Sequence, residues 1–276
     1  MRVKSWRVGL LSLLMMVIAI VYAQLTSTTL PPQQIALDPP APTSTILVAA
    51  AASLQKSLQE ITPLYLKANP SHTINYNFAA SGALQQQIEQ GAPIDVFISA
   101  ADKQMTALQV KGLLVSATQQ DLLTNQLVLI VPNQSSMSLT NFRQLIQPEV
   151  QRISIGEPRS VPVGQYATEF LKNLGILEQV KSKFVLGNNV RSVLTVVETG
   201  DVDAGIVYIT DAKSSDRVTI VATADKKLHS PIQYPIAVLK SSKSLAGARQ
   251  YVEFLQSKSA QAIFRKYGFG IAKPRS

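Results

Sequence analysis

Four predicted strand-to-helix turns carry small or hydroxyl side chains and could bind an anion. They comprise residues 50–53 (AAAS), 79–82 (AASG), 158–164 (PRSVPVG) and 187–190 (GNNV). The first N–H groups of a helix have no acceptor within it and carry partial positive charge, so a helix start can hold an anion without a charged side chain. Tyr208 ends a further apolar run and adds a hydroxyl donor. These five places form the candidate site.

Each of these features also has a purely structural explanation. Ser53, Ser81 and Asn189 are residue types that commonly cap helices through their side chains. The hydroxyl of Tyr208 can be satisfied by a backbone carbonyl within a sheet. Arg191 follows the fourth turn, but exposed arginines more often form surface pairs, so we expect no direct contact with an anion. Taken singly, each residue favours the structural explanation.

An enzymatic alternative begins at the same serine. Ser53 and Lys56 match the S-x-x-K pattern of penicillin-binding enzymes and serine β-lactamases. The two other elements of that pattern fail, because Arg217 stands where Asn is needed and Tyr267 where a small hydroxyl residue is needed. The chain contains no Cys, so it has no thiol nucleophile and no thiolate zinc site. We therefore expect a protein that is not an enzyme.

Short apolar runs alternate with helical patterns along most of the chain. Apolar residues recur at helical spacing after the runs at 46–50, 152–156 and 183–186, for example. This alternation predicts α/β architecture with parallel sheets and helices on both faces. In such sheets, ligands bind beyond the carboxyl ends of the strands, where the four turns lie. The runs at 127–132 and 233–239 are candidates for an outgoing and a returning crossover between two sheets.

The N-terminal segment predicts export. Arg2, Lys4 and Arg7 precede an apolar run from 8 to 23, and small residues at positions 21 and 23 favour signal-peptidase cleavage after Ala23. We expect a signal peptide at 1–23, with an uncleaved anchor as the alternative, and a periplasmic or otherwise extracytoplasmic protein. Residues 24–44 are rich in Thr and Pro and predict a flexible tether.

Charge argues against one class of partner. The formal net charge is +9, and removing the three basic residues of the signal leaves 23 basic and 17 acidic residues, a net charge of +6. No cluster of Lys and Arg carries interleaved aromatic residues, so nucleic acid is not an expected partner. A solvated basic surface explains this balance.

Seven segments, in order, resemble one family, the periplasmic molybdate-binding proteins of ABC importers. They are VAAAASL (48–54), FAASGALQQQ (78–87), IDVFISAAD (94–102), GEPRSVPVGQY (156–166), NVRSVL (189–194), GIVYITDA (205–212) and AQAIFRKYGF (260–269). Together they cover nearly all of the expected folded chain. Sulfate-binding relatives share the fold but match these segments less well, so a sulfate-type oxyanion receptor is the alternative.

The resemblance implies a two-lobe type II periplasmic-binding-protein fold, with a mostly parallel sheet flanked by helices in each lobe and the ligand in the cleft. It implies lobe one at 45–126 plus 233–276 and lobe two at 127–232. It also implies that the ligand is molybdate, and tungstate as well, with no cofactor and no bare metal ion. The expected partner is the membrane permease of the importer, and the protein is expected to be a monomer.

The resemblance further implies how five residues hold the anion. Ser53 and Ser81 would bind through side chains and nearby amides, Val163 and Val190 through backbone N–H groups, and Tyr208 through its hydroxyl. Molybdate at neutral pH is a dianion whose oxygens only accept hydrogen bonds, so a cage without carboxylates suits it. Phosphate is partly protonated and would also need an acceptor.

Overall fold

A computed structural model describes residues 44–273 of the chain. The expected signal peptide at 1–23 lies outside these residues, as does the expected tether at 24–44 except for Ser44, which begins the first strand. Between residues 44 and 273, no helix has the length and apolar character needed to cross a membrane.

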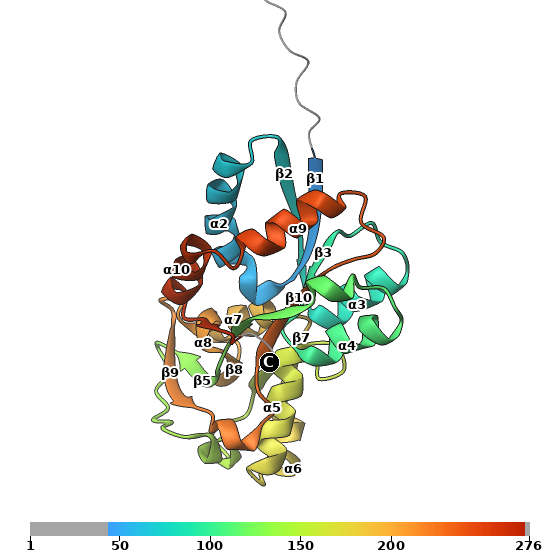
Figure 1. The fold of residues 1–276 in the computed structure, drawn as a ribbon. Helices are drawn as coiled ribbons and strands as arrows, with labels where there is room; N and C mark the ends of the chain where they lie inside the picture. Colours follow the sequence, from blue (N-terminus) through green and yellow to red (C-terminus); the bar gives the residue numbers. More distant parts are fainter. Residues whose placement is uncertain (1–43, 274–276) are drawn as a thin grey trace, which may run out of the picture. The chain divides into compact units, whose positions relative to one another are not determined.

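The first sheet is built from the two ends of the described chain. Its strand order is β11-β4-β10-β3-β1-β2, with β1 parallel to β2 and β3, and β10 antiparallel to β3 and β4. Alternate residues of β1 pack on opposite faces: Val48 and Ala50 contact one core, and Ala49 contacts the other. Helices α2, α9 and α10 cover one side and α3 and α4 the other (Figure 1). The elements are β1 (Ser44–Ala51), α2 (Gln55–Ala68), β2 (His72–Ala79), α3 (Ser81–Glu89), β3 (Val96–Ile98), α4 (Asp102–Val110), β4 (Gln120–Thr124), β10 (Gln233–Val238), α9 (Leu245–Phe254), α10 (Lys258–Lys266) and β11 (Gly270–Ile271).

The second sheet is built from the middle of the chain. Its order is β7-β6-β8-β5-β9, with β6 parallel to β7 and β8, and β5 antiparallel to β8 and β9. Along α7, Val190, Val193, Leu194 and Val197 form one buried stripe at helical spacing. The elements are β5 (Leu127–Pro132), β6 (Ile153–Gly156), α5 (Pro162–Asn173), α6 (Leu177–Val180), β7 (Phe184–Gly187), α7 (Val190–Glu198), β8 (Ala204–Tyr208), α8 (Ile209–Ala212) and β9 (Val218–Thr223).

Both sheets are mixed, which corrects the expectation of mostly parallel sheets. The antiparallel pairings all involve β4, β5 or β10, the strands that flank the two connections between the sheets. Only the pairs β1–β2, β1–β3, β6–β7 and β6–β8 run parallel, and between β4 and β5 the chain passes from one sheet to the other over two residues without a crossover helix. The lobe limits at 126/127 and 232/233 stay a prediction.

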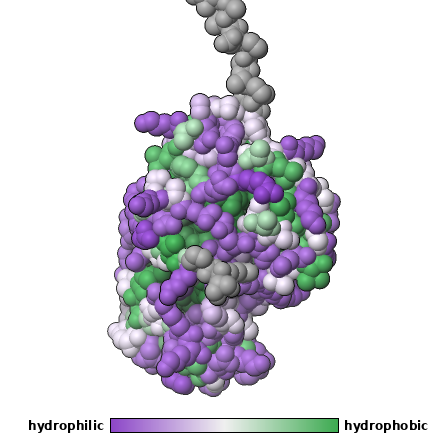
Figure 2. Space-filling model, viewed as in Figure 1, coloured by the Kyte–Doolittle hydropathy of each residue, from purple (hydrophilic) through white to green (hydrophobic). Residues whose placement is uncertain are grey.

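The face of the protein shown in Figure 2 is mainly hydrophilic, with apolar residues between the polar ones.

Helix α5 packs closely against strand β6. A Cβ at Gly164 would stand 1.9 Å from the carbonyl oxygen of Gly156. Glycine at position 164 therefore lets the start of α5 approach the end of β6, where one of the predicted anion-binding turns lies.

We predict that Gly164→Ala lowers the free energy of unfolding. Alanine improves helix propensity by about 1 kcal/mol, but backbone overlap at 1.9 Å forces α5 away from β6, and overpacking of this kind costs about 1–3 kcal/mol or more. Chemical denaturation of both proteins measures the difference. Gly247→Ala in α9 is the control, because the three atoms nearest to its new methyl are side-chain ends and not backbone: the Oγ of Ser244 at 3.1 Å, the Cδ1 of Ile46 at 3.2 Å and the Oγ of Ser44 at 3.3 Å. Equal stability of Gly164→Ala and the parent would contradict this packing.

Candidate anion-binding site

One small cavity brings together all five residues predicted for the site. It lies beyond the carboxyl ends of β1, β2, β6, β7 and β8, the edge of each sheet where ligands of α/β proteins bind. The volume of the cavity is about 10 Å³. By the same measure, one buried water molecule needs about 10–15 Å³. On that scale the cavity admits about one water-sized group and neither a sugar nor a peptide. Among its lining residues are Ser53, Ser81, Val163, Val190 and Tyr208.

A larger groove, of about 820 Å³, lies elsewhere and contains none of these five residues. It runs between residues 132–137 and 198–203 and includes the exposed ion pair of Arg217 and Glu198, whose nitrogen and oxygen are 2.9 Å apart. Its polar groups are already solvated or paired. The small cavity is the better candidate because buried donors converge on it.

The two serines do not cap helices, so the structural explanation considered for them is wrong. Ser53 lies inside a short 3-10 helix (Ala52–Leu54), and Ser81 is the first residue of α3 behind the N-cap Ala80. Neither side chain makes a capping hydrogen bond. Instead, the Oγ of Ser81 accepts the N–H of Ala100 at 3.0 Å. Its hydroxyl hydrogen is therefore left for another acceptor.

The capping explanation is confirmed for Asn189. Its side chain accepts the N–H of Ser192 at 3.0 Å, and the Ser192 hydroxyl in turn accepts the N–H of Asn189. This reciprocal box fixes the start of α7. The first helical residue, Val190, then lies at the cavity with an amide that has no acceptor within its own helix.

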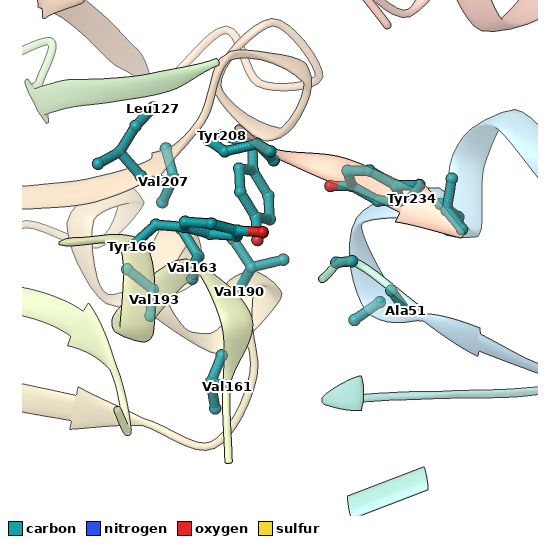
Figure 3. Packing of buried hydrophobic residues seen from close by; sticks show 14 of the residues in the cluster. Ala51, Leu127, Val161, Val163, Tyr166, Val190, Val193, Val207, Tyr208 and Tyr234 are labelled. Carbon is teal, nitrogen blue, oxygen red and sulfur yellow. The ribbon is translucent and has the colours of Figure 1, made fainter. Parts of the chain in front are cut away.

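Val163 occupies the equivalent place on α5. It is the second residue of that helix, behind Pro162, which has no N–H to lose at the first position. Its side chain is 1% exposed, and its amide also lacks an acceptor within the helix. Figure 3 shows Val163 and Val190 close to the ring of Tyr208. The two helix starts thus present backbone donors and positive dipole ends to one cavity.

Tyr208 contributes a donor that nothing in the described chain satisfies. It is the last residue of β8 and is 1% exposed, and its hydroxyl has no hydrogen-bond partner among residues 44–273. The backbone-carbonyl alternative is therefore wrong for this tyrosine. Burial raises the pKa of the Tyr208 hydroxyl well above its ordinary value, so the group stays protonated. A buried donor without a partner costs about 1–3 kcal/mol, which an anion in the cavity would recover.

Loops from the two sheets touch beside the cavity. The N–H of Gly82, at the start of α3, donates to the carbonyl of Ser160 at 3.0 Å. Only glycine fits here, since a Cβ at position 82 would stand 2.5 Å from that oxygen. Three residues after Ser53, Lys56 Nζ donates to the carbonyl of Ser214 at 2.6 Å and joins the two parts of the chain again. These contacts hold the two groups of donors around one space.

No carboxylate lines the cavity among the residues that the structure describes. Glu157, directly before the third turn, accepts hydrogen bonds from Arg159 at the surface, and these bonds lower the pKa of the Glu157 carboxyl. Arg191 donates to the Ser214 hydroxyl at 2.8 Å and lies 3.9 Å from Asp211. Neither Arg159 nor Arg191 lines the cavity, which agrees with the expectation for Arg191. The site consists of neutral donors.

The S-x-x-K interpretation fails on geometry. Lys56 bonds Ser214, while the Oγ of Ser53 lies 2.9 Å from the hydroxyl of Tyr234. Lys266, from the third element of that pattern, pairs with Glu60 at 2.7 Å. Neither lysine therefore bonds the Ser53 hydroxyl in the described part of the chain.

Sequence reasoning missed Asn125, Tyr234 and Asp211. Asn125 and Tyr234 are joined by a hydrogen bond behind Ser53, and Asp211 is a buried acid beside Arg191. Asn125 and Tyr234 lie at the predicted crossovers between the sheets, and this position was the one sequence feature that could have identified them. No pattern in the sequence marks Asp211 as buried.

Comparison with known proteins assigns the family. The model of the family described as bacterial extracellular solute-binding protein matches residues 46–270. The chain belongs to this family. It is a solute-binding protein of the transport class, and the expectation that it is not an enzyme is confirmed by that membership.

Individual relatives cover most of the chain. The Bacillus subtilis lipoprotein YvgL, named provisionally as an ABC transporter substrate-binding protein, is 44% identical over 82% of this chain and 86% of its own length. The molybdate-binding protein ModA of Haemophilus influenzae is 37% identical over 81% of this chain and 89% of its own length. The periplasmic molybdate-binding protein of Azotobacter vinelandii has a similar structure, with a TM-score of 0.75 at 21% identity, covering 83% of this chain and 100% of that one. The two-lobe type II fold is thereby confirmed.

We predict that Asp211→Asn raises the free energy of unfolding, relative to the parent, by more at pH 8 than at pH 5. Burial raises the pKa of Asp211 from about 3.8 to about 7, against the opposing charges of Arg191 and Lys56. A raised pKa means that the parent loses stability as pH rises from about 4 to about 7. Asparagine has no such loss, so the stability difference between variant and parent should grow by about 3 kcal/mol from pH 5 to pH 8, which is roughly two pKa units at about 1.4 kcal/mol each. Denaturation at both pH values measures it, and a gap independent of pH would contradict the burial of the charged form.

Proposed function

We propose that this protein captures molybdate, and also tungstate, outside the cytoplasm and delivers it to the membrane permease of an ABC importer. One observation carries the proposal: hydroxyl donors without protein acceptors and helix-start amides surround a single small cavity that no described carboxylate lines. The ModA relatives, which are named for molybdate binding, support the choice of anion.

The chemistry of the donors favours a fully deprotonated anion. Each hydrogen bond to a charged group contributes about 1.5–3 kcal/mol net, so several converging donors give tight capture. Neutral donors avoid the cost of burying opposed full charges. Phosphate carries a proton on part of its population at neutral pH and finds no acceptor for it. Sulfate presents the same acceptors as molybdate, so a sulfate-type receptor is the second candidate.

The proposal includes the rest of the expected architecture. Ser53 and Ser81 follow strands of the first sheet, and Val163, Val190 and Tyr208 belong to the second, so the anion would hold the lobes at 45–126 plus 233–276 and 127–232 together. Export would use the signal at 1–23, leaving a Thr/Pro tether at 24–44. The exported protein would act as a monomer and would bind no nucleic acid.

Calorimetric titration of residues 24–276 tests the choice of ligand. We expect tight binding of molybdate and tungstate and much weaker binding of sulfate and phosphate. Equal affinity for sulfate would move the assignment to a sulfate-type receptor. Binding of none of these oxyanions, or acylation of Ser53 by a penicillin-type probe, would overturn the proposal.

We predict that Tyr208→Phe separates binding from stability. The variant loses one hydrogen bond to a charged group, which corresponds to about a ten- to hundredfold loss of molybdate affinity. It also removes a buried hydroxyl without a partner, so the unliganded variant should unfold at the same temperature or higher. Titration and thermal unfolding measure the two effects. Unchanged affinity would exclude Tyr208 from the site.

We predict that Gly82→Ala weakens binding by blocking closure. Its methyl would meet the carbonyl of Ser160, so the turns of the two sheets could no longer touch. Small-angle scattering should show the parent shrinking on addition of molybdate and the variant shrinking less. Ser160→Ala is the control, because it keeps the carbonyl that accepts the Gly82 N–H. An unchanged radius in the parent, with binding confirmed, would contradict the two-lobe clamp.

A further inference from the structure

Two polar residues lie at the connections between the sheets, directly behind Ser53. Asn125 stands between β4 and β5, and Tyr234 is the second residue of β10. The N–H of Asn125 donates to the carbonyl of Ile232 at 3.2 Å, so the outgoing and returning connections are bonded to each other. The side chains of both residues are buried. They belong to the two connections between the sheets and also reach the cavity wall through Ser53.

A backbone donor fixes the orientation of the Asn125 amide. Its Oδ1 accepts the N–H of Gln126 at 2.9 Å, so its other end must be the nitrogen. That nitrogen donates one hydrogen to the hydroxyl of Thr210 at 2.9 Å and one to the hydroxyl of Tyr234 at 3.1 Å. The Tyr234 oxygen is thereby used as an acceptor.

The hydroxyl of Tyr234 must then donate to Ser53. Tyr234 is 0% exposed, and its oxygen lies 2.9 Å from the Oγ of Ser53. If Ser53 donated instead, the Tyr234 hydrogen would be buried without an acceptor among the described residues, which folded proteins rarely tolerate. Burial also raises the pKa of Tyr234 well above its ordinary value, so the proton is present. The direction of the chain of hydrogen bonds is therefore from Asn125 through Tyr234 to Ser53.

We propose that Asn125 and Tyr234 are positioning residues that make Ser53 a hydrogen-bond donor to the bound anion and set its preference for anions without a proton. The Ser53 oxygen already accepts from Tyr234, which leaves its own hydrogen for the cavity. A protonated anion such as hydrogen phosphate would have to donate to that oxygen, which already accepts from Tyr234 and has one lone pair left. The proposal rests on the oxyanion function proposed above and adds a source of selectivity that lies outside the cavity.

The same arrangement recurs at the second serine by an independent route. The Oγ of Ser81 accepts the backbone N–H of Ala100 at 3.0 Å, and Ser81 is 0% exposed. Its hydrogen is left for the cavity in the same way. At Ser81 a backbone group sets the direction and cannot be removed by substitution, whereas at Ser53 the side chain of Tyr234 sets it. Tyr234 is therefore the position at which the direction can be tested.

Tyr234→Phe removes the hydroxyl and keeps the ring. The centroid of the Tyr234 ring lies 5.5 Å from that of Phe269 and 5.9 Å from that of Tyr208. A phenylalanine ring can make the same edge-to-face contacts. We expect molybdate affinity to fall about tenfold, because the Ser53 hydroxyl is no longer held as a donor to a charged group. Phosphate affinity should fall by less than molybdate affinity, or rise, so the ratio of molybdate affinity to phosphate affinity should decrease. Competition titrations at pH 7 give both values.

Two further variants separate positioning from general damage. In a Ser53→Ala background, Tyr234→Phe should cause no further loss of molybdate affinity, because the group that it positions is gone. Tyr251→Phe is the matched control: it removes a buried hydroxyl that bonds Tyr76 at 2.7 Å, away from the cavity, and should change neither affinity nor ratio. Asn125→Ala should act in the same direction as Tyr234→Phe and tests the chain of hydrogen bonds if Tyr234→Phe does not fold.

The outcomes distinguish this proposal from the function on which it rests. If the parent binds no oxyanion, the proposed function fails. If the parent binds molybdate while folded Tyr234→Phe keeps its affinity and its phosphate ratio, the positioning role is overturned. Equal losses from Tyr234→Phe in the parent and in the Ser53→Ala background would also overturn it.

Discussion

A small dianion that leaves water loses its hydration shell, and only hydrogen-bond donors placed around it can replace that shell without opposite charge. Every such donor must lack a protein acceptor before the anion arrives. Tyr208 shows this condition directly, because its buried hydroxyl has no partner in the described chain. Ser81 shows it through a neighbour, since its oxygen is occupied by the N–H of Ala100 and its hydrogen is not. Donors left unsatisfied in this way disfavour the empty closed form, so the ligand would stabilise closure.

The fold supplies these donors at the ends of parallel strand pairs. Strands β1 and β2 point the turns of Ser53 and Ser81 to one edge of the first sheet, and β6 and β7 do the same for α5 and α7 in the second. Small residues let the backbones approach. Gly82 permits contact between the sheets' loops, and Gly164 permits α5 to lie against β6. The antiparallel strands β4, β5 and β10 flank the connections between the sheets and place Asn125 and Tyr234 behind the cavity.

Sequence patterns predicted the α/β elements and the turns at the carboxyl ends of the strands, and the structure places the five candidate residues around one cavity. The patterns did not predict the direction of every strand or the hydrogen-bond partners. β4 was missed because QDLLT has only two strongly apolar residues, and β11 because it has two residues in all. Ser53 and Ser81 have the type and spacing of caps, and only coordinates show that their side chains bond Tyr234 and Ala100 instead. Such partners lie up to 181 positions apart in the chain, where no local pattern connects them. The resemblance supplied the choice of site residues that propensity alone left open.

In the proposed site, hydrogen bonds alone would hold the anion, and no protein atom would be bonded to its metal atom. X-ray absorption at the molybdenum edge, recorded on the protein saturated with molybdate, tests this most directly. We predict a spectrum with the four oxygen neighbours and the tetrahedral pre-edge signal of the free ion, because no carboxylate or imidazole of the described chain lines the cavity. A spectrum with five or six oxygen or nitrogen neighbours would contradict the account, since a protein atom would then be bonded to the metal.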